Sequence, residues 1–158
     1  GLIFSKLYPK LIKGLVLTGS SGLYENSMGD SYPKREDYNY IKERTEAVFF
    51  DPKIATKKIV DEVYETVNDR KKLIKILAMA KSAIRHNMSN DLPNILAETA
   101  IIWGENDSVT PPEVADEFKK LLPNSQLFWI ENCGHAPMME HPKKFNSVMN
   151  SWLKEKKL

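Results

Sequence analysis

Three short apolar runs, at residues 14–18, 99–103 and 126–130, constrain the fold of this chain more than any other feature. Each run contains three or four consecutive apolar side chains without polar alternation, which is typical of strands buried on both faces. Segments with helical periodicity separate the runs, so consecutive strands should be parallel. The sequence therefore predicts an α/β fold with a parallel sheet.

A block of about sixty residues with helical signals and no clear strand lies between the first and second runs. Residues 36–50 are moderately helical, and Asp51 followed by Pro52 indicates the start of a second helix that ends near Asn68. Asp69 can cap a third helix, apolar on one face, whose other face carries Arg70, Lys71, Lys75, Lys81 and Arg85. We interpret this basic face as solvated, with contact to an anionic surface as the alternative.

Helices are also predicted in the two flanking parts of the chain. Residues 1–8 have an amphipathic pattern, apolar at positions 3, 4, 7 and 8, but no N-cap, so we expect that a preceding segment is missing. Thr110 is the expected N-cap of a helix that begins with two prolines. Pro142 opens a last helix, in which residues 145, 148, 149, 152 and 153 form an apolar face.

The composition indicates one globular domain and does not point to nucleic acid or a membrane as a partner. Of the 158 residues, 42% are hydrophobic and 28% charged, and the net charge of +2 is too small to indicate nucleic acid or an anionic membrane. No apolar run approaches the ~20 residues that span a bilayer. Cys133 is the only cysteine and cannot form an internal disulfide, so we expect a reducing, cytoplasmic location.

An acid and a histidine follow the second and third apolar runs. Asp107 lies four residues beyond Trp103, and His135 lies five beyond Ile130. If the two strands are neighbours, both loops open at the same edge of the sheet, where sites of parallel sheets form. A carboxylate there can accept the Nδ1 proton of the histidine and leave Nε2 free to take a proton from a serine. We therefore expect these two side chains to meet.

The expected nucleophile is missing from the sequence. Acid-then-histidine order is that of hydrolases whose serine comes first, on a Gly-x-Ser-x-Gly turn, and no such turn occurs in these 158 residues. The segment 19–22, Gly-Ser-Ser-Gly, has the wrong spacing, because a turn centred on Ser21 needs glycine where Leu23 stands. Ser5 lies within the first helical pattern, away from any turn. We interpret segment 19–22 as a loop lining the pocket.

Other interpretations of the same residues compete with catalysis. Taken alone, Asp107 fits an ordinary Asn-Asp-Ser turn. Cys133 is two residues from His135 and is better explained as a small packing residue than as a nucleophile. His86, His135 and His141 lack the spacing of a helical metal site, so no metal is expected, and His141 is interpreted as a cap before the last helix.

Three segments carry a family resemblance. Residues 101–112, Ile-Ile-Trp-Gly-Glu-Asn-Asp-Ser-Val-Thr-Pro-Pro, resemble the acid region of the α/β-hydrolase superfamily, in the branch of C–C bond hydrolases, esterases and haloalkane-dehalogenase relatives. Residues 133–142, Cys-Gly-His-Ala-Pro-Met-Met-Glu-His-Pro, resemble the histidine region of that branch. Residues 7–17 resemble the helix after the nucleophile and the next strand.

The resemblance implies an α/β-hydrolase fold of which this chain is the C-terminal portion. Residues 1–22 would be a core helix and strand, residues 23–95 an inserted helical cap, and residues 96–158 the C-terminal core. Asp107 would be the triad acid and His135 the general base. The nucleophile, the oxyanion loop and the earlier strands would lie on an N-terminal segment of the same hydrolase.

The implied activity is serine-dependent hydrolysis of an ester or a C–C bond in a small-molecule substrate, with no cofactor. Without the N-terminal segment the chain is expected to be inactive. Two alternatives stay open. One is a non-catalytic ligand-binding receptor of the same fold, and the other is a haloalkane-dehalogenase-like hydrolase whose nucleophile is aspartate.

Overall fold

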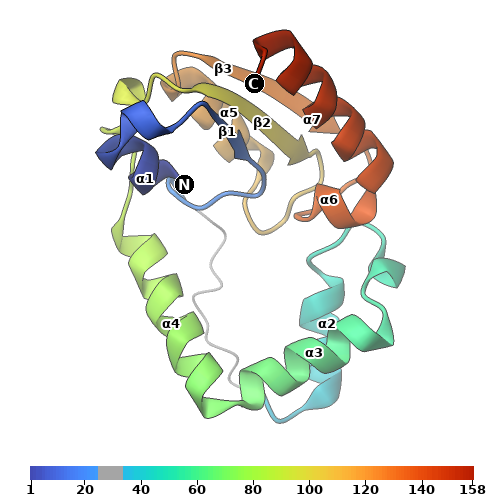
Figure 1. Ribbon diagram of the computed structural model, residues 1–158. Coiled ribbons are helices and arrows are strands. Elements are labelled where there is room, and N and C mark those ends of the chain that lie inside the picture. Colours follow the sequence, from blue (N-terminus) through green and yellow to red (C-terminus); the bar gives the residue numbers. More distant parts are fainter. Residues whose placement is uncertain (25–33) are drawn as a thin grey trace.

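The computed structural model describes residues 1–24 and 34–158 (Figure 1). Its elements, in chain order, are α1 (Leu2–Leu7), the 3₁₀ turn η1 (Pro9–Leu11), β1 (Gly14–Leu17), α2 (Tyr38–Glu46), η2 (Pro52–Ile54), α3 (Lys57–Asn68), α4 (Arg70–Arg85), η3 (Leu92–Asn94), β2 (Glu98–Gly104), α5 (Pro112–Leu121), β3 (Ser125–Ile130), α6 (Pro137–Glu140) and α7 (Pro142–Lys156). Part of the predicted insert, residues 25–33, lies outside the described residues.

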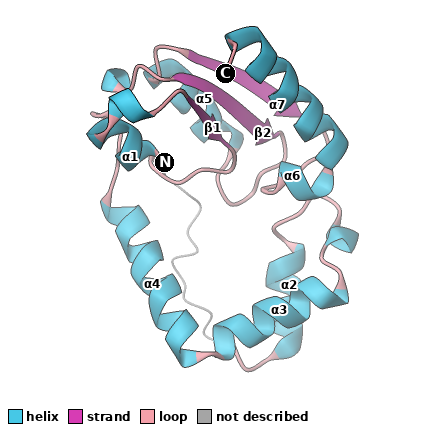
Figure 2. Ribbon diagram, in the orientation of Figure 1, coloured by secondary structure: helices cyan, strands magenta, loops and turns pink. Residues whose placement is uncertain are grey.

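The three predicted strands form one parallel sheet in the order β1-β2-β3 (Figure 2). Leu17 pairs with Ile101 across the first ladder, and Trp103 pairs with Trp129 across the second. The α/β fold with a parallel sheet is thus confirmed. Because β2 and β3 are neighbours and parallel, the loops after both strands open at the same edge.

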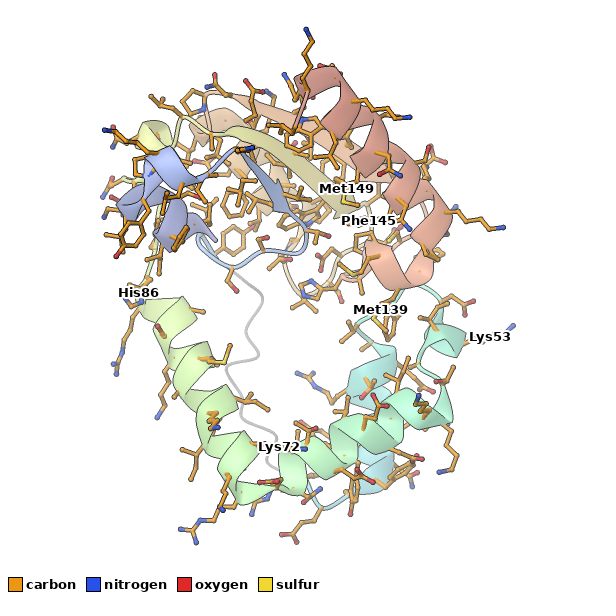
Figure 3. The ribbon with its side chains drawn as sticks, viewed as in Figure 1. Lys53, Lys72, His86, Met139, Phe145 and Met149 are labelled. Carbon is orange, nitrogen blue, oxygen red and sulfur yellow. The ribbon has the colours of Figure 1, made fainter. Side chains whose placement is uncertain are left out.

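Helices cover both faces of the sheet. On one face, α1 and α5 pack against β1 and β2, and the buried residues of this cluster include Leu17, Ile101, Trp103, Val114 and Phe118. On the other face, α7 packs with Phe145 and Trp152 against Ala100 and Ile102. Figure 3 shows Phe145 and Met149 on the side of α7 that is turned toward the sheet. Alternate residues of β2 pack into the apolar clusters on the two faces of the sheet, which explains why the sequence of β2 is apolar without interruption.

Helices α2, α3 and α4 form a helical arm below the sheet in Figure 1, and the C-terminal end of α4 returns toward α1. Within the arm, α2 packs against α3 and α3 against α4. Ile41 of α2 and Val60 and Val67 of α3 are buried, whereas α4 has no buried residue among those whose side chains are described. The division of the chain at residues 22 and 95 into core and cap stays a prediction.

Two local predictions differ from the structure, and one short helix was not predicted. Asp51 caps only the short turn η2, and α3 begins after Thr56, because Ala55 leaves the helical region with ψ at 67°. Helix α5 begins after Pro111, and the Thr110 hydroxyl bonds elsewhere instead of capping it. The short helix α6 was not predicted.

Most apolar side chains of α1 are exposed, whereas an amphipathic helix was expected to bury its apolar stripe. Ile3, Phe4, Leu7 and Tyr8 are 46–60% exposed, while Leu2 and Ser5 of the same helix are buried. In the described sheet β1 pairs only with β2, so β1 is an edge strand. An uncovered apolar helix face therefore lies beside an open sheet edge. Among the described residues, no helix has the length and apolar character required to cross a membrane.

Candidate active site

The loops after β2 and β3 are joined by backbone hydrogen bonds beyond the sheet. The amide of Glu105 donates to the carbonyl of Ile130 at 3.1 Å, and that of Asn106 donates to Cys133 at 2.9 Å. Gly104 ends β2 directly against the backbone of Cys133 and Gly134, where an added Cβ would collide. The two loops are thus held in close contact just before Asp107 and His135.

The side chains of Asp107 and His135 meet as the strand order predicts. His135 Nδ1 lies 3.0 Å from Oδ2 of Asp107 and 3.2 Å from Oδ1. Because a carboxylate can only accept, this contact assigns the ring proton to Nδ1. In the neutral imidazole, Nε2 is then an acceptor. The His135 side chain is 27% exposed, so the ring is accessible.

The Asp107 carboxylate is buried and fully bonded. Its side chain is 1% exposed. Oδ1 accepts from the backbone amides of Val109 and Thr110, both at 2.9 Å, and Oδ2 accepts from the Thr110 hydroxyl at 2.8 Å. Such bonds offset the cost of burying a charge and fix the direction of each oxygen. Thr110 also lies 3.2 Å from His135 Nδ1.

Thr110 is a residue of the candidate site for which a different role was expected from the sequence. Its side chain was expected to cap α5 but instead lies buried between the acid and the histidine. The signal for this was present, since an Asp side chain commonly bonds to the amides two and three residues later in an Asx turn.

Gly19, in the loop after β1, is a second residue whose contact with the acid–histidine pair was not predicted. Its φ of +51° lies in the left-handed region, and a Cβ on Gly19 would be 2.7 Å from both Cε1 and Nδ1 of His135. Any side chain here would displace the imidazole. The loops after all three strands therefore converge on His135.

A cavity of about 520 Å³ lies next to this loop, between α1, β1 and the end of α4. Ser20, Ser21 and Gly22 of segment 19–22 line it, together with Met79, Ser82 and His86 of the α4 region. Figure 3 shows His86 at the end of α4 nearest the sheet. Asp107 and His135 do not line this cavity. Ser20 of the cavity lining is the neighbour in sequence of Gly19, which lies against His135.

The remaining candidates have structural explanations. The Ser5 hydroxyl is buried and donates to the Gly1 carbonyl at 2.9 Å. His141 directly precedes α7 but makes no side-chain capping bond, and its Nε2 contacts the Asn132 carbonyl at 2.9 Å. Within the part of the chain that the structure describes, no group of three His, Cys, Asp or Glu side chains could hold a metal ion.

Cys133 should be chemically inert in the folded protein. Burial, followed by the nearby charge of Glu140, raises the pKa of its thiol to about 12. At pH 8 such a thiol is thiolate in only about one molecule in 10⁴, against roughly a quarter for an ordinary cysteine. We expect iodoacetamide to modify Cys133 at least ~100-fold more slowly in native protein than in urea, measured by mass spectrometry. Equal rates would show that the thiol is accessible and refute its packing role.

Comparisons with known proteins agree with this architecture. The family model described as alpha/beta hydrolase fold matches residues 1–142. The chain is 48% identical to MGS-MChE2, an alpha/beta hydrolase enzyme from the metagenome of sediments of the Mar Chica lagoon, Morocco, with a TM-score of 0.73 over 99% of this chain and 57% of that one. It is 25% identical to Lipase 1 of Psychrobacter immobilis over 94% of this chain and 52% of the lipase.

A third similarity concerns the fold alone. The structure of 2-hydroxy-6-oxo-6-phenylhexa-2,4-dienoate hydrolase from Rhodococcus sp. strain RHA1 is 17% identical and superposes with a TM-score of 0.82, over 97% of this chain and 59% of that one. The chain thus spans about half to three fifths of the length of these three proteins.

Proposed function

The chain belongs to the α/β-hydrolase family, and we propose that it supplies the acid, Asp107, and the general base, His135, of a serine-dependent hydrolase. One observation carries the proposal. The buried Asp107 carboxylate contacts His135 Nδ1 at 3.0 Å while the accessible ring keeps Nε2 for a third group. This is the arrangement that activates a serine hydroxyl.

In the proposed reaction His135 moves one proton in each half. Nε2 takes the proton of the serine hydroxyl as its oxygen attacks the substrate carbonyl, and the imidazolium is stabilised by Asp107. The proton then passes to the leaving group as its bond to the carbonyl carbon breaks, which gives an acyl-enzyme. A water molecule, deprotonated by the same Nε2, cleaves the acyl-enzyme and returns the proton to serine.

We propose that the serine lies on an N-terminal segment of the same hydrolase, which packs on α1 and β1. The 158 residues contain no Gly-x-Ser-x-Gly turn, and they correspond to 57% of the length of the 48% identical hydrolase. The exposed apolar face of α1 and the open edge of β1 are the surfaces that such a segment would cover. Oxyanion stabilisation would also come from that segment.

We propose a small-molecule substrate with a scissile ester or C–C bond, bound beneath α2–α4 as a cap. A lipase and the hydrolase of a phenylhexadienoate are among the similar proteins, which favours these two bond types over others. This chemistry needs no cofactor, because the proton transfers and the covalent intermediate use side chains only.

A fluorophosphonate probe tests the proposal. The complete hydrolase, with its N-terminal segment, should be labelled at a single serine and should hydrolyse a short-chain p-nitrophenyl ester, whereas the 158-residue chain should do neither. Ligand binding without labelling or turnover would favour the receptor alternative. Halide release from a haloalkane without labelling would instead indicate an aspartate nucleophile. Either result would refute the serine mechanism.

A further inference from the structure

The Glu140 carboxylate, at the end of α6, joins two distant parts of the chain. Its Oε1 accepts a hydrogen bond from the Gly134 amide at 2.6 Å. Its Oε2 accepts from the amides of Phe50 and Asp51, at 2.8 Å and 3.3 Å. One charged group therefore binds three backbone donors, and bonds of this kind to an ionised acceptor are about twice as strong as neutral ones. The residue before His135 is thereby tied to the segment that leads from α2 to η2.

That segment, residues 47–51, is also bonded to both loops of the acid–histidine pair. The His135 amide donates to the Val48 carbonyl at 2.9 Å, and the Ser108 hydroxyl donates to the Ala47 carbonyl at 3.1 Å. The contact is close, because a Cβ on Gly134 would lie 2.6 Å from the Val48 carbonyl oxygen. Segment 47–51 thus packs directly against the loop that carries His135.

Apolar packing continues the same connection into the helical arm. Ala136, the residue after His135, is buried in a cluster with Phe49, Ala55 and Val60. Val60 belongs to α3, and Ala55 lies between η2 and α3. His135 is therefore held on its N-terminal side through Glu140 and on its C-terminal side through Ala136. Both attachments lead to the part of the chain between the C-terminal end of α2 and the N-terminal part of α3.

We propose that Glu140 is a positioning residue: it sets the imidazole of His135 against Asp107 and couples the pair to the helices α2 and α3. The expected effect of Glu140 on catalysis rests on the proposed function, whereas its expected effect on the geometry of His135 does not. Hydrogen-bond partners of this kind keep a reacting side chain within the narrow range of productive positions. A displacement near 1 Å can cost ~100-fold in rate.

The substitution Glu140→Gln isolates this role because it keeps the size of the side chain. An amide has only one acceptor oxygen, and its nitrogen would face backbone amides that also donate. If the oxygen stays with Gly134, the amides of Phe50 and Asp51 lose their partner, and in the other orientation Gly134 loses its partner. Either way, one of the two attachments is broken.

Kinetics and spectroscopy of the complete hydrolase test the inference. Glu140→Gln should lower kcat by about 10- to 100-fold, with a smaller change in KM, and should shift or broaden the Nδ1 proton resonance of His135. The control Glu131→Gln changes an exposed glutamate in the loop just after β3 and should leave both unchanged. Active-site titration with the probe corrects kcat for unfolded protein. If the glutamine variant does not fold, Glu140→Asp, which keeps the charge but is shorter, should give a smaller loss.

One result would overturn the inference: a glutamine variant with unchanged kcat and an unchanged His135 resonance, whether or not its melting temperature falls. An unlabelled, inactive wild type would instead reject the proposed function, and the resonance of His135 would still decide whether Glu140 positions the ring.

Discussion

Replacing His135 by alanine is expected to lower kcat of the complete hydrolase by about 10⁴- to 10⁶-fold. The loss is large because Nε2 of this one ring takes the serine proton, delivers it to the leaving group and activates water. In the described part of the chain, no second base lies beside Asp107 to replace it, since the other contacts of that carboxylate are Val109 and Thr110. KM should change much less, because the substrate is held mainly by other groups.

The measurement is steady-state hydrolysis of a p-nitrophenyl ester, with purified variants compared at equal concentration of folded protein. His141→Ala is the matched control: this imidazole lies six residues away, is hydrogen-bonded to the Asn132 carbonyl, and precedes α7. We expect that control to stay within about tenfold of wild type. An alanine variant at 135 with kcat near that of the control would reject His135 as the general base.

The fold follows from the sequence where the hydrophobic pattern alone decides it. The apolar runs predicted β1, β2 and β3 to within a residue or two, because a strand buried on both faces must be apolar along its length. The N-cap residue Asp69 and the first-turn residue Pro142 likewise predicted where α4 and α7 begin. Here a local signal and the tertiary structure require the same residues.

Predictions failed where a side chain had two possible partners. Thr110 precedes two prolines and has the composition of an N-cap, yet its hydroxyl bonds to a carboxylate three residues earlier. Glu140 had no predicted role, but two of its three backbone partners, Phe50 and Asp51, lie 90 and 89 residues earlier in the chain. The exposed stripe of α1 is similar: it is apolar, but none of the described residues buries it. Such long-range choices are set by the fold and not by the local pattern.

Replacing Asp107 by asparagine is expected to lower kcat by about 10⁴-fold through the wrong imidazole tautomer. The amides of Val109 and Thr110 both donate to Oδ1, so the asparagine oxygen should occupy that position. Its NH₂ group then points at His135 Nδ1, which must become an acceptor. The ring proton moves to Nε2, and that nitrogen can no longer take a proton from serine.

This tautomer change separates the proposed role of Asp107 from a simple turn residue. Nitrogen-15 spectra of the imidazole should show the proton on Nδ1 in wild type and on Nε2 in Asp107→Asn. Asp116→Asn, an exposed position in α5, serves as the control and should keep both the wild-type tautomer and the wild-type rate. A turn residue would also tolerate asparagine, which is common in such turns. If Asp107→Asn therefore kept more than about a tenth of the wild-type kcat, with the proton still on Nδ1, Asp107 would be a turn former only.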